Sequence, residues 1–212
     1  MSENRKFSVL MSVYVKENPV FLEEAVESII HQTLKPSEVV IVEDGPLTPE
    51  LYQVLEKLEA QSSIPIKRCP LEQNRGLGLA LQYGVLQCQY DVIARMDTDD
   101  IAVEDRFEQQ FELMEKENLD LLGGHIAEFI DQPDEIVSYR RVPTKHEDII
   151  AYQRMRSAFN HMTVMFKKEM VLKAGNYEDG LYMEDDLLWL NMISAGARTG
   201  NVDQILCKVR VG

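Results

Sequence analysis

Over its first hundred residues the chain alternates short apolar runs with longer amphipathic segments. Apolar runs without a clean period of two are typical of strands covered on both faces, and four occur, at 7–14, 38–42, 64–68 and 91–96. Asn18-Pro19 and Thr48-Pro49 each place an N-cap residue before a proline, which signals a helix start. Helices are predicted at 19–32, 49–61, 75–88 and 104–117. This order predicts βαβ units, a right-handed and mostly parallel sheet, and a nucleotide-binding half over residues 1–100.

The second half of the chain follows a different pattern. Closely spaced strand candidates around a Gln132-Pro133-Asp134 turn indicate a small antiparallel portion, at 119–123, 125–130 and 136–139. The remaining predicted elements are a helix at 145–154, a strand at 162–166, a short helix ending at Gly175, a helix at 184–195 and a strand at 202–211. With 212 residues, we expect one α/β domain over 1–212, a Rossmann-like sheet flanked by helices, in which 101–212 form the catalytic half.

Composition narrows the class of partner. The formal net charge is −14, which argues against nucleic acid because phosphate backbones require a surplus of Lys and Arg. Cys69, Cys88 and Cys207 show no metal-binding or disulfide spacing, so we expect free thiols in a reducing, cytoplasmic compartment. We see no signal peptide and no apolar stretch that would span a membrane. Contact with the inner face of a membrane stays compatible with the sequence, although the acidity of the chain makes it unfavourable.

An acidic cluster directly follows the predicted strand 91–96. It holds Asp97, Asp99 and Asp100. Two carboxylates about 4 Å apart repel by roughly 4 kcal/mol at an effective dielectric near 20, so a dry cluster requires a cation or protonation. Oxygen ligands select hard ions such as Mg²⁺, Mn²⁺ or Ca²⁺. The alternative is a solvated acidic turn that opens the next helix. The end of a buried strand favours the metal site, because ligands of open α/β sheets bind there.

Polar residues also follow the other predicted strands. Ser12 and Tyr14 end the first strand, and Asp44 with Gly45 ends the second. Asp44 is equally compatible with a turn and with a carboxylate that accepts a hydrogen bond from the ring N–H of a base such as uracil. The glycines beside Arg75 lack the third glycine of a dinucleotide loop. Backbone N–H groups or Arg75 could still approach a phosphate there, and a packing role is equally compatible.

Asp185 is placed on the apolar side of a predicted helix. If 184–195 is helical, Asp185 shares a face with Leu188, Trp189 and Met192, so its carboxylate points inward. A helix N-terminus stabilises a carboxylate by about 0.3–1 kcal/mol, whereas neighbouring acids raise its pKa. A carboxylate under such opposed influences suits general base catalysis. The alternative reading is an ordinary acidic N-terminal cap.

With these residues in view, the chain resembles the family 2 glycosyltransferases of the GT-A fold, the inverting enzymes of bacterial polysaccharide and lipopolysaccharide assembly. The likeness runs from Phe7 to about Val211. The matching segments, in chain order, are Ser12-Val13-Tyr14, Val42-Glu43-Asp44-Gly45, Asn74-Arg75-Gly76-Leu77, Ala94-Arg95-Met96-Asp97-Thr98-Asp99-Asp100, Asn160-His161-Met162-Thr163 and Glu184-Asp185-Asp186-Leu187-Leu188-Trp189.

The resemblance implies transfer of a sugar from a UDP-sugar donor to a hydroxyl of a saccharide or lipid-linked saccharide acceptor in cell-surface polysaccharide biosynthesis. Asp44 would contact uracil and Asp97 the ribose, and Asp99, helped by Asp100, would hold a divalent metal (Mn²⁺ or Mg²⁺) on the diphosphate. Asp185 would be the general base. The full set of residues expected at the donor is Ser12, Tyr14, Asp44, Arg75 and Asp97. The set expected on the acceptor side, within 101–212, is Asn160, His161, Glu184 and Trp189.

Two departures from the family pattern refine this expectation. Processive members carry Gln-x-x-Arg-Trp beyond the base. Here Gln153-Arg154-Met155-Arg156 is followed by Ser157 and precedes Asp185, so a single transfer is expected. Family members commonly continue past the point where this chain stops, so a C-terminally truncated catalytic core is expected.

A sugar nucleotidyltransferase is the alternative enzyme. It would need a glycine-rich and basic loop after the first strand, and residues 15–19 contain no glycine. An acidic Ca²⁺-binding module is the non-catalytic alternative, and no EF-hand spacing is present.

Overall fold

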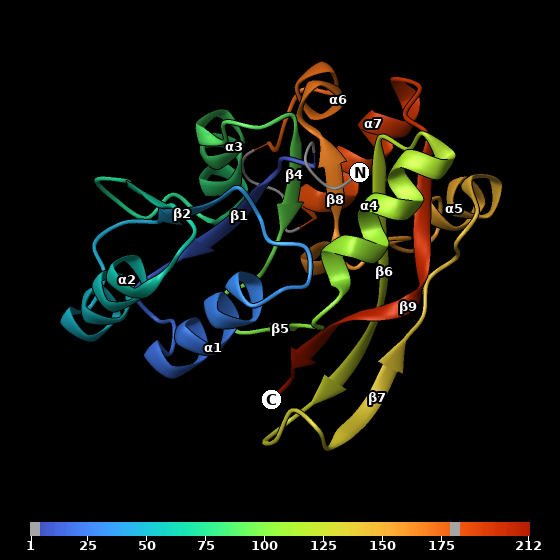
Figure 1. Cartoon of the computed structure of the whole chain (residues 1–212). Helices are drawn as coiled ribbons and strands as arrows, with labels where there is room; N and C mark the ends of the chain where they lie inside the picture. The colour runs from blue at the N-terminus through green and yellow to red at the C-terminus, as the bar shows by residue number, and fades with distance from the viewer. Residues whose placement is uncertain (1–4, 179–182) are drawn as a thin grey trace.

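The computed structural model describes residues 5–178 and 183–212, and its first half forms the predicted parallel sheet (Figure 1). Both predicted helix caps are present, since Asn18 Oδ1 accepts the Val20 N–H at 2.9 Å and Thr48 Oγ1 accepts the Leu51 N–H at 3.3 Å. The strands are parallel in the order β3-β2-β1-β4, with bounds β1 Ser8–Val13, β2 Glu38–Glu43, β3 Ile66–Pro70 and β4 Val92–Arg95. The first three helices are α1 Pro19–Ile30, α2 Pro49–Gln61 and α3 Leu77–Gln87.

The second half extends the same sheet in the order β4-β8-β6-β9-β5, with β7 paired to β6. Strand β8 is antiparallel to both β4 and β6, so β6 runs in the same direction as β4. The strands are β5 Ile101–Ala102, β6 Leu121–Phe129, β7 Ile136–Arg140, β8 Met165–Lys167 and β9 Thr199–Arg210. The helices are α4 Arg106–Glu117, α5 His146–Gln153, α6 Lys168–Lys173 and α7 Glu184–Ser194, with a 3₁₀ turn at His161–Thr163.

Two local predictions were wrong, and one short strand was missed. The two strands predicted at 119–123 and 125–130 form one strand, β6. Its Gly123 and Gly124 do not break it, because their N–H groups donate to Asn201 Oδ1 and Thr163 Oγ1. The strand predicted at 162–166 begins only at Met165, after the 3₁₀ turn. Strand β5 was missed because its two residues are defined only by pairing with β9.

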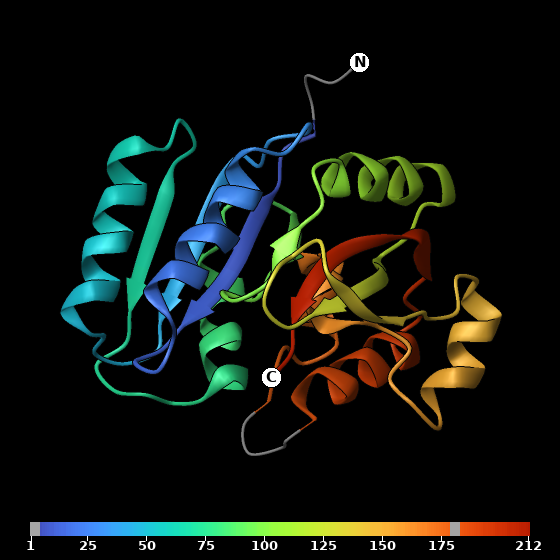
Figure 2. The same ribbon diagram turned by 90° about the horizontal axis from the view of Figure 1, so that it is seen from below.

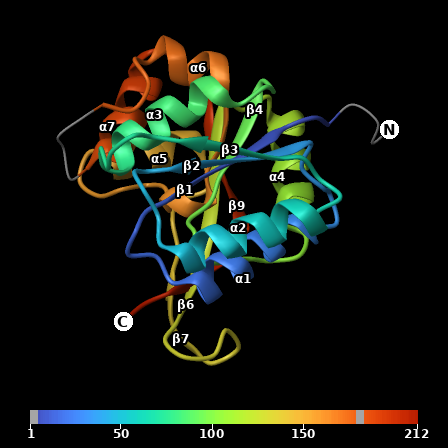
Figure 3. The same cartoon turned by 90° about the vertical axis from the view of Figure 1, so that its left-hand side faces the viewer.

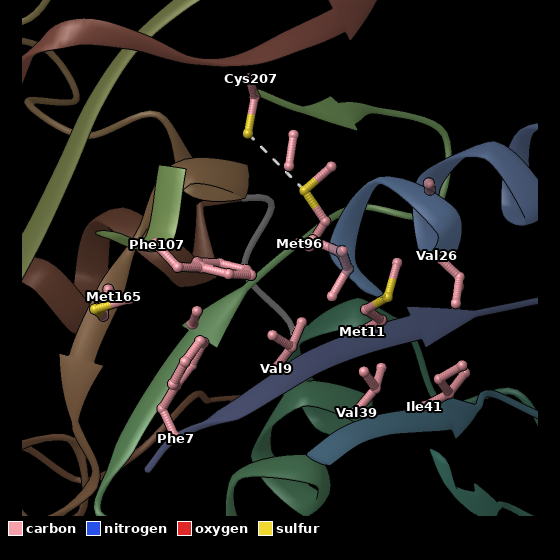
Figure 4. Packing of buried hydrophobic residues seen from close by; sticks show 14 of the residues in the cluster. Phe7, Val9, Met11, Val26, Val39, Ile41, Met96, Phe107, Met165 and Cys207 are labelled. Carbon is pink, nitrogen blue, oxygen red and sulfur yellow. Dashed lines mark hydrogen bonds between the residues drawn. The ribbon is translucent and has the colours of Figure 1, made fainter. Parts of the chain in front are cut away.

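Helices cover both faces of the sheet and bury its strands on both sides. Along β1, Val9 and Met11 pack in the cluster that includes residues of α1, α2 and α4, whereas Leu10 packs in the cluster that includes residues of α3 and α7. Figure 2 shows these two layers, and Figure 4 shows the first cluster, in which Met96 and Cys207 contact through their sulfur atoms. This two-sided burial explains why the strand sequences lack alternation.

The carboxyl ends of β1, β2, β4 and β6 lie at one edge of the sheet, because these strands share a direction. This edge is where ligands bind in open α/β sheets. In the described part of the chain, no helix has the length and apolar character that crossing a bilayer requires.

Candidate active site

A pocket of about 320 Å³ opens at the carboxyl edge of the parallel strands. It brings together five of the predicted donor and metal residues, which lie as much as 87 positions apart in the sequence. They are Ser12, Tyr14, Asp44, Asp97 and Asp99, joined in the lining by Glu17, Asn74, Gly76, Leu77 and Thr98. Arg75 and Asp100 are absent from this lining.

Asp44 holds one wall of the pocket in place. Its carboxylate accepts the N–H of Arg75 at 2.7 Å and the N–H of Gly76 at 3.0 Å. Gly45 has a φ of 85°, and a Cβ there would lie 2.6 Å from Asn74 N, so only glycine allows this close approach. Arg75 therefore reaches Asp44 through its backbone, and the predicted contact of its side chain with the donor stays a prediction.

Asp97 is supported from below by a buried arginine that the sequence analysis did not single out. Arg95 lies on β4 with 1% of its surface exposed, and its Nη1 pairs with Asp97 Oδ2. Arg106, also buried, donates to the Arg95 carbonyl at 2.7 Å. A buried charge without a partner is strongly unfavourable, so this pair fixes the Asp97 carboxylate at the pocket floor. In the sequence, the feature that could have identified Arg95 is an arginine inside an otherwise apolar strand.

The acidic cluster is as crowded as the sequence suggested. Burial, together with the charges of Asp97 and Glu17, raises the pKa of Asp99 to about 6. Burial and the charges of Asp97 and Asp99 likewise raise the pKa of Asp100. Glu17 adds another carboxylate to the pocket and accepts a hydrogen bond from Thr98 Oγ1 at 2.5 Å. A cation at Asp99 would relieve this repulsion.

Asp100 faces away from the pocket lining. It is 2% exposed, and its Oδ1 accepts the N–H of Arg210 on β9 at 3.0 Å. Asp100 therefore links β9 to the acidic loop through this hydrogen bond. Its predicted role beside Asp99 in metal binding stays a prediction.

The carboxylates fit a divalent cation that is shared with a ligand. Among residues 5–178 and 183–212, no group of three or more His, Cys, Asp or Glu side chains is arranged to enclose a metal. Mg²⁺ commonly uses only one or two protein carboxylates and takes its other ligands from water and substrate phosphates. Asp99 offers carboxylate oxygens in a pocket that Asp97 and Glu17 also line, and this arrangement matches that incomplete type of site.

Asp185 lies in the first turn of α7, and the predicted helical face is confirmed, because Leu188, Trp189 and Met192 are buried on it. Its side chain is 24% exposed. Burial raises the pKa of Asp185, and the charges of Asp186 and Glu184 add to this, whereas the Asp186 N–H and Arg95 oppose it. The sequence left open whether the helix N-terminus or the neighbouring acids would dominate the pKa of Asp185. In the structure, burial is the largest influence, and it raises this pKa.

His161 lies beside Asp185 in a neutral form. Its Nδ1 is 3.9 Å from Asp185 Oδ2, and its Nε2 is 3.0 Å from the Tyr177 hydroxyl. Burial and the nearby Arg95 lower the pKa of His161 well below its usual value. When Tyr177 donates to Nε2, the proton on Nδ1 faces the carboxylate. Tyr177, which the sequence analysis did not mention, thus sets the orientation of the ring.

The other predicted acceptor residues occupy different depths. Trp189 is fully buried among four rings, at 5.8 Å from Phe159 and 5.9 Å from His161 between centroids. Asn160 is 1% exposed and donates to the Gly124 carbonyl at 2.8 Å. Glu184 is partly exposed at the start of α7. Trp189 packs against the His161 ring, and Asn160 directly precedes His161 in the chain. Contact of Trp189, Asn160 or Glu184 with an acceptor stays a prediction.

A larger cavity elsewhere contains none of the predicted site residues. It measures about 740 Å³ and lies between α4, α5 and β9. His146 lines it, but its Nδ1 is 2.8 Å from Thr199 Oγ1. Chemistry, rather than volume, therefore selects the smaller pocket as the candidate active site.

Comparisons with known proteins identify the family of the chain. A model of the family "Glycosyl transferase family 2" matches residues 8–175. An uncharacterized glycosyltransferase of Haemophilus influenzae is 47% identical, over 98% of this chain and 76% of its own length. The Escherichia coli UDP-Gal:alpha-D-GlcNAc-diphosphoundecaprenol beta-1,3-galactosyltransferase is 38% identical, over 97% of this chain and 74% of its own.

Solved structures share the fold. The mannosyltransferase PcManGT of Pyrobaculum calidifontis, solved with GDP-Man and Mn²⁺, superposes with a TM-score of 0.74 at 15% identity, over 97% of this chain and 57% of that one. The chain thus spans about three quarters of these curated relatives and less than two thirds of that structure. The predicted GT-A fold is confirmed, and the chain belongs to glycosyl transferase family 2.

Proposed function

We propose that this glycosyltransferase moves a sugar, with inversion, from a UDP-sugar to a hydroxyl of a saccharide or lipid-linked saccharide during bacterial cell-surface polysaccharide synthesis. The name of the Escherichia coli relative, which specifies UDP-Gal and a diphosphoundecaprenol-linked acceptor, supports both substrate classes. Family membership favours this function over the sugar nucleotidyltransferase and Ca²⁺-binding alternatives.

One observation carries the proposal: the donor pocket and Asp185 adjoin each other although they come from different halves of the chain. The starts of α3 and α7 are in contact, since a Cβ at Gly78 would lie 2.8 Å from the Glu178 carbonyl oxygen and 3.4 Å from Glu184 Cβ. Gln82 Nε2 also donates to the Tyr177 carbonyl at 2.6 Å. A donor in the pocket would therefore expose its sugar toward Asp185.

In the proposed reaction, Asp185 accepts the proton of the acceptor hydroxyl. The acceptor oxygen then bonds to the anomeric carbon from the face opposite the leaving group, and the bond to UDP breaks with its electron pair on the diphosphate. A general base of this kind contributes typically 10²–10⁴-fold. A divalent cation held by Asp99 would supply Lewis-acid stabilisation of the leaving diphosphate, worth several kcal/mol. Asp97, fixed by Arg95, orients the ribose.

The direct test is calorimetry of UDP binding with Mn²⁺ or Mg²⁺ and with a chelator. We expect binding to require the metal, because the acidic pocket otherwise repels a diphosphate. Asp99→Asn should weaken binding in the presence of metal. It should not weaken metal-free binding, because it removes one of the carboxylates that repel the diphosphate. The exposed Glu72→Gln serves as a control of the same charge change. Equal affinity with and without chelator would contradict the role of Asp99. A panel of UDP-sugars then identifies the donor.

A further inference from the structure

Four exposed arginines lie in two neighbouring segments of a chain whose net charge is −14. Arg140 and Arg141 lie at the end of β7, and Arg154 and Arg156 follow α5. None of the four forms a salt bridge with a carboxylate of the described residues. Most other arginines, such as Arg68 and Arg210, are paired. We call these four, with Tyr139 and Met155, the arginine surface.

The two segments of the arginine surface are joined and carry exposed apolar side chains. Arg140 Nη2 donates to the Ser157 carbonyl at 3.4 Å, which links the end of β7 to the loop after α5. Met155 is 88% exposed and Tyr139 is 60% exposed. Basic residues interleaved with an aromatic and a flexible apolar side chain are the composition that binds the headgroup region of an anionic bilayer.

The arginine surface lies at the same edge of the sheet as the candidate active site. Strand β6 runs parallel to β4, so the β6–β7 hairpin projects at the carboxyl edge (Figure 3). At the end of α5, Gln153 Nε2 donates to Asp186 Oδ1 at 2.7 Å. Asp186 is the neighbour of Asp185, so the loop that carries Arg154 and Arg156 adjoins the acceptor side.

We propose that the arginine surface docks this protein onto an anionic phospholipid bilayer, with Asp185 turned toward acceptors held at the membrane. The proposal rests on the proposed function for the acceptor, but the docking itself does not require it. The tip of the hairpin carries Asp131, Asp134 and Glu135. The flank formed by the arginines, rather than this acidic tip, therefore faces the lipid phosphates.

Electrostatic docking has a defined size and salt dependence. A basic residue near an anionic membrane surface strengthens binding about fivefold, so removing two should weaken it about 25-fold. The attraction is screened over about 8 Å at physiological ionic strength and over about 3 Å at 1 M. Binding should therefore be lost at high salt.

The experiment is co-flotation of the 212-residue protein with vesicles of phosphatidylcholine, with and without phosphatidylglycerol. The test variant is Arg154→Gln/Arg156→Gln. The matched control is Lys35→Gln/Lys116→Gln, which removes the same charge from exposed positions outside the arginine surface. We expect binding only to the phosphatidylglycerol vesicles, a loss of about 25-fold in the test variant, and little change in the control.

Three results would overturn the docking surface: no vesicle binding, equal binding to neutral vesicles, or equal losses in both double variants. Competition by inorganic phosphate at low millimolar concentration would also overturn it, because it would point to a site for the free ion. UDP calorimetry on the same variants separates the two proposals. Intact UDP binding without vesicle binding rejects docking alone, whereas vesicle binding without UDP binding rejects the proposed function alone.

Discussion

At the scale of single residues, the burial of Asp185 predicts how the activity depends on pH. Only the deprotonated carboxylate can accept a proton, so activity should fall as the pH drops through the pKa of Asp185. Burial raises this pKa from 3.8, so the acidic limb of kcat/KM should lie above the ordinary aspartate range.

The measurement is kcat/KM against pH at saturating metal. Asp186→Asn is the control, because it removes a neighbouring charge that raises the pKa of Asp185 and should move the limb to lower pH. An acidic limb at or below the pKa of a free aspartate would contradict the assignment.

Asp44 combines a visible structural contact with a predicted ligand contact. Asp44→Ala removes the acceptor of the Arg75 and Gly76 N–H groups, and hydrogen bonds to a charged group are worth about 1.5–3 kcal/mol. We expect UDP affinity to fall by roughly tenfold to a hundredfold. Calorimetry with UDP and CDP separates the two contacts, because cytosine lacks the ring N–H donor.

If Asp44 recognises uracil, the variant should lose more affinity for UDP than for CDP. Equal losses would leave only the loop contact, and an unchanged UDP affinity would remove Asp44 from donor binding altogether. Glu72→Ala, on the same exposed loop, controls for the lost charge.

Where a side chain marks the end of a strand, sequence reasoning at this scale identified residues that the structure brings into one pocket. Asp97 and Asp99 were found because carboxylates follow an apolar run directly. Arg95 and Tyr177 were missed because their meaning depends on partners, Asp97 and His161, that only the fold brings into contact.

At the scale of elements, the contact of α3 with the sheet depends on a small residue. A Cβ at Gly84 would lie 2.4 Å from Leu10 Cδ1 and 2.9 Å from Val42 Cγ2, both in the core. Alanine usually stabilises a helix interior by about 0.5–1 kcal/mol relative to glycine. Overpacking a tight core costs typically 1–3 kcal/mol, which outweighs this gain on average, so Gly84→Ala should destabilise the protein by about 1 kcal/mol.

Urea denaturation measures this difference, with Ser194→Ala as a control on the exposed end of α7. A Gly84→Ala variant that is more stable than the parent would show that α3 can move away from β1 and β2 without loss.

Elements were predictable where local signals define them. Capping residues fixed the starts of α1 and α2, and apolar runs fixed β1 and β2. The division of β6 was misjudged because Gly123 and Gly124 locally suggest a break, whereas their N–H groups are satisfied by Asn201 and Thr163. Only the folded sheet supplies those partners.

At the scale of the whole molecule, Arg210 on β9 links the last strand to the acidic loop that contains Asp100 and to α1. Arg210 donates its backbone N–H to Asp100 and pairs through Nη2 with Glu24 at 2.9 Å. Its guanidinium also lies 3.7 Å from the centroid of the Phe21 ring. Contacts that join positions 110 residues apart or more leave no local pattern, so the sequence could not assign Asp100 this role.

The site as a whole is divided between two halves of the chain. Residues between 12 and 99 line the pocket proposed for the donor, and α7 carries Asp185, the proposed base. The account therefore predicts that donor binding and proton transfer can be separated by mutation, because the groups that perform them lie on different elements.

The most direct test compares the Asp185→Asn and Asp186→Asn variants. The rate at which each transfers the sugar of a UDP-sugar to an acceptor, or to water, is measured. The first variant should lose about 10²–10⁴-fold in rate while UDP affinity stays near that of the parent. The second loses a carboxylate already bound by Gln153 and should retain most of its turnover. Turnover of Asp185→Asn within a few-fold of the parent would contradict the account.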